Sequence, residues 1–241
     1  MATRTSRFCR IELRTTDADS ARAFYSRVLG HDRAVIWTLH EQARARGAPA
    51  HWLGHLAVDD VERAATAFVQ CGAVSLGPLL STAGGGQTVV LRDPGGAVIA
   101  VSTAPPASAP LGVDAAWYVL NTSDMPRTIA AYPEVFGWGL AERGGLDDGM
   151  LPFAWRPGEE TVGAVADIAA RPGVHPHWLF FFAVEALEQA AAQAREAGGV
   201  VHSAFVLPTG ERACVADDPQ GAAFALCERR RDSVRPPPGA P

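Results

Sequence analysis

The side chains with the greatest potential for chemistry lie on two short stretches of the chain. Arg10, Glu12 and Arg14 alternate along the first stretch, and His55 lies in the second. A carboxylate beside an imidazole can form a general base, because the carboxylate orients the ring and raises its basicity. Arginines on the same face could hold an anionic substrate group or stabilise an enolate. The simpler interpretation is a partly solvated ion pair between Glu12 and Arg10 or Arg14.

Several other kinds of site are excluded or poorly supported. All 21 basic residues are Arg, which excludes Schiff-base chemistry and a lysine general base. Gly84-Gly85-Gly86 lacks the following helix and the Lys-Ser/Thr pair of a phosphate loop, and no Gly-x-Ser-x-Gly nucleophile motif occurs. His175 and His177 have the spacing of a zinc pair, but Pro176 separates them and no third donor lies nearby in the sequence.

Composition limits the partners. The chain has 241 residues, is 48% hydrophobic and carries a formal net charge of -5 without a basic cluster before its last dozen residues. We therefore expect a small-molecule ligand and no nucleic acid. No apolar run is long enough for a bilayer, and the first residues do not resemble a signal peptide, so we expect a cytoplasmic protein that does not bind membranes. The four separated cysteines favour reduced, structural thiols.

Internal similarity organises the chain. The segment from His51-Trp52-Leu53 to the Asp-Pro-x-Gly turn at 93–96 recurs from His177-Trp178-Leu179 to the turn at 218–221. The two copies are 126 residues apart at the His-Trp-Leu motif and 125 residues apart at the turn. The strand-like segment 10–17 recurs at an offset of only 107 residues. The second copy therefore contains an insertion within 138–176, and the first module of the chain is predicted to be truncated.

Each unit is predicted to form a strand, a helix and further short strands. Residues 8–15 alternate between apolar and charged side chains, as a half-buried strand does. Asp17 or Asp19 is expected to cap the next helix, which Gly30 ends.

The repeat also sets the expected domain boundaries. We predict a first domain at 7–104, a linker at 105–112 and a second domain at 113–228. The ends at 1–6 and 229–241 are expected to be disordered.

A defined series of motifs recurs in order in both halves. In the first half these are Arg10 to Thr16, Asp17, Phe24-Tyr25, Leu29-Gly30, Val58-Asp59-Asp60 and Asp93-Pro94-x-Gly96-Ala97. In these features the chain resembles the vicinal-oxygen-chelate superfamily of glyoxalases, extradiol dioxygenases, fosfomycin-resistance and bleomycin-binding proteins, and above all its two-domain glyoxalase-like members. The resemblance implies an α+β fold of four βαβββ-type modules, the first one truncated, which form two half-open barrel-like sheets with flanking helices.

The resemblance also locates the positions that hold a metal in metal-using relatives. In the first domain these positions fall on Arg10, Leu53 and Ala100. The equivalent positions of the second domain fall on Trp117, Leu179 and Ala225. None of these side chains is a metal donor, so we expect no metal and no cofactor.

Two functions remain open at this point. The first is metal-independent binding of a small organic, aromatic or polyketide-like molecule, with an association to secondary metabolism that rests only on composition. The second is a metal-free isomerase, lyase or cyclase in which Glu12 and His55 act as acid and base, beside Arg10. A metal-dependent glyoxalase or dioxygenase is the weaker third reading, and we expect a monomer or a homodimer. The candidate ligand-binding residues are Arg14, Trp37, Trp117, Val119, Asn121, Trp155, Leu179 and Phe181. In the second domain these residues either line an aromatic cavity or simply fill a core.

Overall fold

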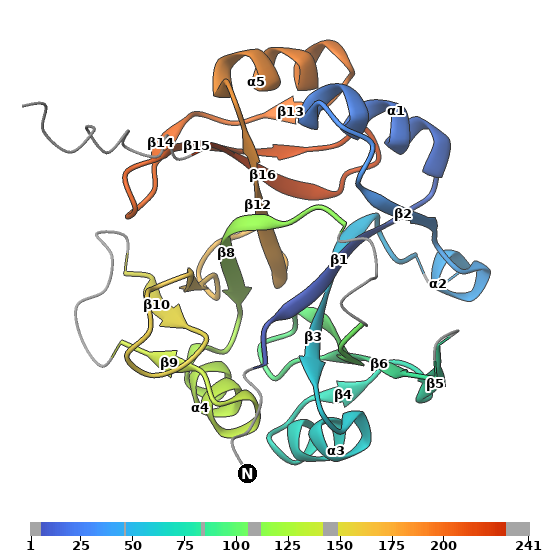
Figure 1. The fold of residues 1–241 in the computed structure, drawn as a ribbon, viewed down its shortest axis with the longest axis vertical. Coiled ribbons are helices and arrows are strands. Elements are labelled where there is room, and N and C mark those ends of the chain that lie inside the picture. Colours follow the sequence, from blue (N-terminus) through green and yellow to red (C-terminus); the bar gives the residue numbers. More distant parts are fainter. Residues whose placement is uncertain (1–5, 46, 83–84, 106–111, 142–148, 230–241) are drawn as a thin grey trace, which may run out of the picture.

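The structure is a computed structural model that describes residues 6–45, 47–82, 85–105, 112–141 and 149–229. Two mixed β-sheets, one from each half of the chain, are flanked by helices (Figure 1). Helices from different halves lie side by side at the ends of the molecule (Figure 1). These pairs are α1 (Ala18–Leu29) with α5 (Leu187–Glu196) and α3 (Val61–Gln70) with α4 (Met125–Phe136). The predicted α+β class with two sheets is confirmed.

The first sheet has the strand order β2-β1-β3-β7-β6-β4, and β5 pairs with β6. β1 (Phe8–Thr15) is antiparallel to β3 (His51–Val58) at the centre, and each has a parallel neighbour, β2 (Val35–Thr38) and β7 (Val98–Thr103). The other elements are α1 (Ala18–Leu29), α2 (Glu41–Ala45), α3 (Val61–Gln70), β4 (Val74–Ser75), β5 (Leu80–Ser81) and β6 (Gln87–Arg92).

The second sheet repeats this central arrangement. β8 (Ala115–Thr122) is antiparallel to β12 (His177–Val184), and their parallel neighbours are β11 (Gly163–Asp167) and β16 (Ala223–Glu228). The other elements are α4 (Met125–Phe136), β9 (Gly139–Leu140), β10 (Leu151–Ala154), α5 (Leu187–Glu196), β13 (Val200–Val201), β14 (Phe205–Val206) and β15 (Arg212–Asp217).

The first module is truncated, as predicted. In the second sheet, β10 and β9 continue the sheet beyond β11. Among the described residues, the first sheet has no strand beyond β2, and α2 leads from β2 to β3. β2 is therefore an edge strand, and its side chains are less covered than those of β11.

The strand register agrees with the sequence offsets. Ile11 pairs with Gly54 at the centre of the first sheet, and Tyr118 pairs with Phe180 at the centre of the second. An offset of 107 residues carries Ile11 onto Tyr118, and an offset of 126 carries Gly54 onto Phe180. Positions matched by these offsets thus occupy the same place in the two sheets, which allows one domain to be compared with the other residue by residue.

The first helix begins and ends as its sequence predicts. Asp17, not Asp19, is the N-cap of α1, and its side chain accepts a hydrogen bond from the Ser20 backbone N–H at 3.0 Å. Gly30 ends the helix with a φ of 73°, a left-handed conformation that glycine adopts without strain. The helix thereby buries Phe24 and Tyr25 against the core.

One core lies between the two sheets, and two matching polar chains cross it. Tyr25 donates to the Asp218 carboxylate at 3.1 Å and accepts from the indole N–H of Trp52 at 3.0 Å. In the matching chain, Tyr132 donates to Asp93 at 2.9 Å and accepts from Trp178 at 3.2 Å. Both aspartates belong to the Asp-Pro-x-Gly turns of the opposite domain, so these turns connect the domains as well as the strands.

The predicted ends and linker lie mostly outside the described residues. Ser6 is an exception, because it is buried and its carbonyl accepts from the Trp138 indole at 2.8 Å. The backbone N–H of Arg229 likewise donates to Val184 at 2.8 Å. None of the helices in the described part of the chain could cross a bilayer. All four cysteines are free, and Cys214 and Cys227 are buried.

Candidate functional site

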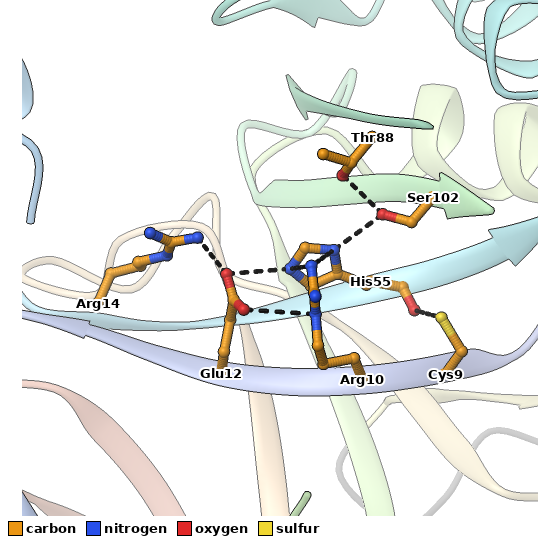
Figure 2. A network of polar contacts seen from close by, with 7 residues as sticks. All are labelled: Cys9, Arg10, Glu12, Arg14, His55, Thr88 and Ser102. Atoms are coloured by element: carbon orange, nitrogen blue, oxygen red, sulfur yellow. Dashed lines mark hydrogen bonds and ion pairs between the residues drawn. The ribbon is translucent and has the colours of Figure 1, made fainter. Parts of the chain in front are cut away.

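Alternation along β1 separates an apolar face of the first sheet from a polar one. Ile11 and Leu13 point into the core between the sheets. Arg10, Glu12 and Arg14 point the opposite way, and the register of β3 adds His55 to their side. We call this side the polar face; Figure 2 shows its central contacts.

Glu12 is the buried centre of the polar face, with 1% of its side chain exposed. Its Oε2 lies 3.3 Å from Nε of Arg10, its Oε1 lies 3.2 Å from Nε2 of His55, and it also forms a close ion pair with Arg14 (Figure 2). Burial alone would raise the pKa of Glu12, but the hydrogen bond from His55 and the charges of the two arginines lower it to about 2. The carboxylate is therefore ionised at neutral pH.

His55 is the second buried member of the polar face. Its Nδ1 lies 2.8 Å from Oγ of Ser102 and 3.0 Å from a guanidinium nitrogen of Arg10, and Ser102 lies 2.6 Å from Oγ1 of Thr88. Burial lowers the pKa of His55 against the opposing effect of Glu12, so the ring is neutral at neutral pH. The tautomer that satisfies both sides donates from Nε2 to Glu12 and accepts at Nδ1.

The sequence predicted that Glu12 and His55 share this face, but it did not single out Ser102 and Thr88. A usable signal was present for Ser102. Glu12 and His55 lie two residues beyond the expected metal positions on β1 and β3, and Ser102 lies two residues beyond Ala100 on β7. Thr88 is found only through its pairing with Ser102 across β6 and β7.

Trp37 and His51 flank Arg14 on the polar face. Arg14 pairs with Trp37 across β1 and β2 and with His51 across β1 and β3. Trp37 is 53% exposed, which is unusual for so large an apolar side chain. Nδ1 of His51 donates to the Pro49 carbonyl at 2.9 Å, and burial lowers the pKa of its ring.

The equivalent face of the second sheet is a packed apolar cluster. Trp117, Val119, Leu179 and Phe181 are each at most 7% exposed and pack with small side chains of β11, β15 and β16. Asn121 at the edge of this face lies 3.3 Å from Nε2 of His177. These side chains fill the face of the second sheet, as the simpler sequence interpretation has it.

Trp155 lies apart from that cluster. It belongs to the core between the sheets, where its ring meets Phe8, Tyr118 and Trp138 at centroid distances of 5.8, 5.2 and 5.1 Å. Trp155, Trp117 and Phe181 therefore do not line one common cleft, because Trp155 packs in the core between the sheets while the other two pack on the opposite face of the second sheet.

One family model matches most of the second half of the chain. Residues 115–226 match the family model of the Glyoxalase/Bleomycin resistance protein/Dioxygenase superfamily. The second half of this chain is a member of that superfamily. Over the whole chain, the protein named "Putative glyoxylase CFP32" from Mycobacterium bovis and Mycobacterium tuberculosis is 28% identical, covering 90% of this chain and 92% of that protein.

Solved structures of a glyoxalase and a dioxygenase share the fold of both halves of this chain. The Mn(II)-bound glyoxalase from Novosphingobium aromaticivorans matches with a TM-score of 0.60 at 15% identity, over 94% of this chain and 83% of that one. Homoprotocatechuate 2,3-dioxygenase from Arthrobacter globiformis matches with a TM-score of 0.63 at 17% identity, over 95% and 81%. The family model confirms the family resemblance for residues 115–226, and the two solved structures confirm the predicted fold.

The residues of this chain do not fit the metal ion that some superfamily members hold. At the expected positions of the first domain, Arg10 places a permanent cation beside Glu12 and His55, and Leu53 and Ala100 offer no lone pair. The second domain offers only Trp117, Leu179 and Ala225. Within the ranges that the structure describes, no three His, Cys, Asp or Glu side chains are grouped to hold a metal. The donor set therefore disagrees with a metal centre.

Proposed function

We propose that the protein binds a small organic molecule on the polar face of the first domain, without a metal ion. The observation that carries this proposal is the difference between the two domains at equivalent positions. Where the first domain has Arg10, Glu12, His55 and Ser102, the second has Trp117, Val119, Phe181 and Cys227. The fold is thus compatible with apolar side chains at these four positions, so its stability does not demand the polar cluster.

Energetics support a role beyond folding. A buried ion pair is often no more stabilising than well-packed apolar side chains, because removing two charges from water costs as much as their attraction returns. The first domain has the costlier arrangement, because Glu12 is almost fully buried while the side chains of Arg10 and Arg14 are 40% and 34% exposed. Two partly exposed cations on one buried carboxylate leave positive charge at the surface, where an anionic group of a ligand can accept hydrogen bonds.

A specific observation supports a second candidate, a metal-free isomerase, lyase or cyclase. Ser102, His55 and Glu12 form a continuous chain of hydroxyl, imidazole and carboxylate. Two features weaken it: a carboxylate whose pKa is about 2 is a poor base, and both ring nitrogens of His55 already face protein groups. Binding is therefore the function that the geometry supports best.

The test is calorimetric titration of the purified protein with a panel of small aromatic compounds, with and without EDTA. We expect binding that EDTA does not change, that Trp37→Ala weakens and that Val206→Ala, an exposed substitution in the second domain, leaves intact. Binding that requires an added metal, or that survives Trp37→Ala unchanged, would contradict the proposal. Each compound that binds is also incubated with the protein and followed by NMR. If the wild-type protein converts the compound into a product and His55→Gln does not, the result would favour the enzyme instead.

A further inference from the structure

The polar face carries an excess of positive charge. Arg10 and Arg14 are permanent cations, and Glu12 is the carboxylate that acts on the rings of both His51 and His55. Burial lowers the pKa of each ring, so neither histidine is charged at neutral pH. Two positive charges therefore face one negative charge, and one positive charge has no counterpart in the cluster.

The geometry directs that charge outward. Glu12 lies below the two guanidinium groups, at 1% exposure, and holds one on each side. A guanidinium has five N–H donors, and within the described part of the chain Arg14 has Glu12 as its one hydrogen-bond partner. The Arg14 side chain is about one-third exposed, so a carboxylate at the surface can accept two of the remaining N–H groups in parallel.

A flat apolar surface adjoins the charge. Trp37 neighbours Arg14 across the parallel pair β1 and β2, and the described residues place no aromatic ring in contact with it. Because the sheet ends at β2, no further described strand covers the indole on that side. An exposed indole beside a guanidinium fits a ligand that joins a planar ring to an anionic group.

We propose that the ligand is a small aromatic carboxylate, whose anionic group is bound by Arg10 and Arg14 and whose ring stacks on Trp37. Glu12 is a positioning residue in this arrangement, since it holds both guanidinium groups without meeting the ligand. The inference rests on the proposed binding function and narrows it to one chemical class. It also assigns a role to Arg10 at the expected metal position, because a cation there attracts the negatively charged carboxylate of the ligand directly.

The experiment compares two probes of the same ring and nearly the same shape, the anionic 2-naphthoate and the neutral 2-naphthamide, by isothermal titration calorimetry at pH 7. We expect naphthoate to bind at least about tenfold more tightly, the smallest preference that a charge-assisted bidentate contact should give. Arg14→Gln should abolish that preference, whereas Arg127→Gln, an exposed arginine of α4 paired with Asp124, should keep it. Trp37→Ala should weaken both probes.

The outcomes separate this inference from the proposed function. Equal binding of both probes, weakened by Trp37→Ala, would overturn the anion class and leave small-molecule binding in place. A preference for naphthoate that Arg14→Gln leaves intact would also overturn the inference. If neither probe binds and no compound of the wider aromatic panel does, both proposals fail together.

Discussion

Replacing the buried carboxylate of the polar face, Glu12→Gln, should destabilise the protein by an amount that depends on pH. The neighbours of Glu12 lower its pKa from the ordinary 4.5 to about 2. Linkage converts that difference into about 3 kcal/mol of stability at pH 7. Glutamine has nearly the same shape but no charge, so two arginines would remain beside a neutral amide.

The sign of the pH dependence follows from the direction of the shift. A group whose pKa is lower in the folded protein contributes fully above its unfolded pKa, here 4.5, and loses its contribution as pH falls toward the folded value of about 2. The deficit of Glu12→Gln should therefore be about 3 kcal/mol at pH 7 and shrink to about half of that at pH 3.

Urea unfolding of the wild type and the variant at both pH values measures this deficit. The matched control is Glu196→Gln, which removes the exposed partner of Arg27 and should cost less than about 1 kcal/mol. A Glu12→Gln protein as stable at pH 7 as the Glu196→Gln control would refute the reasoning. So would a deficit that is the same at pH 7 and pH 3.

Two further predictions concern the core between the domains. A Cβ on Gly54 would lie 2.3 Å from a ring carbon of Phe8 and 2.7 Å from Phe180, so Gly54→Ala should cost about 1 to 3 kcal/mol in urea unfolding, while Gly77→Ala, in open space, should be near neutral. Burial raises the pKa of Asp93 from 3.8 to about 6, so its contribution is fully present below pH 3.8 and is lost as pH rises through 6. The stability of Asp93→Asn relative to wild type should therefore improve by about 2 kcal/mol between pH 4 and pH 7, and an unchanged difference would argue against a buried, poorly solvated carboxylate.

The sequence predicted the fold because its strongest signals were local and repeated. The helix stop at Gly30 and the turn at 93–96 each follow from residue type, and their recurrence fixed the order of elements. Glu12 and His55 could be assigned to one face before any distance was known, because each lies two residues beyond a position that holds a metal in metal-using relatives.

Long-range partners could not be predicted in this way. The hydroxyl of Tyr25 meets Asp218, 193 residues further along the chain, and nothing in either local pattern specifies the other. The burial of each face could not be predicted either, because the alternation of apolar and polar residues shows on which face of a strand a side chain lies but not whether other elements cover that face. Trp37 and Trp117 both belong to such faces, yet the first is 53% exposed and the second is 3% exposed.

The difference in depth has a structural origin in the truncated module. The second sheet continues from β11 to β10 and β9, and its face is filled by large side chains from the central strands, with Trp117 opposite Phe181. Among the described residues the first sheet ends at β2, so its face lies nearer to water, where the arginine side chains can keep their charged ends partly solvated. Loss of two strands thus lowers the cost of a charged cluster at the first site, and the same loss exposes the indole beside it. The two features on which ligand binding is proposed to depend therefore have one cause in the sequence, the shortened segment between α1 and β3.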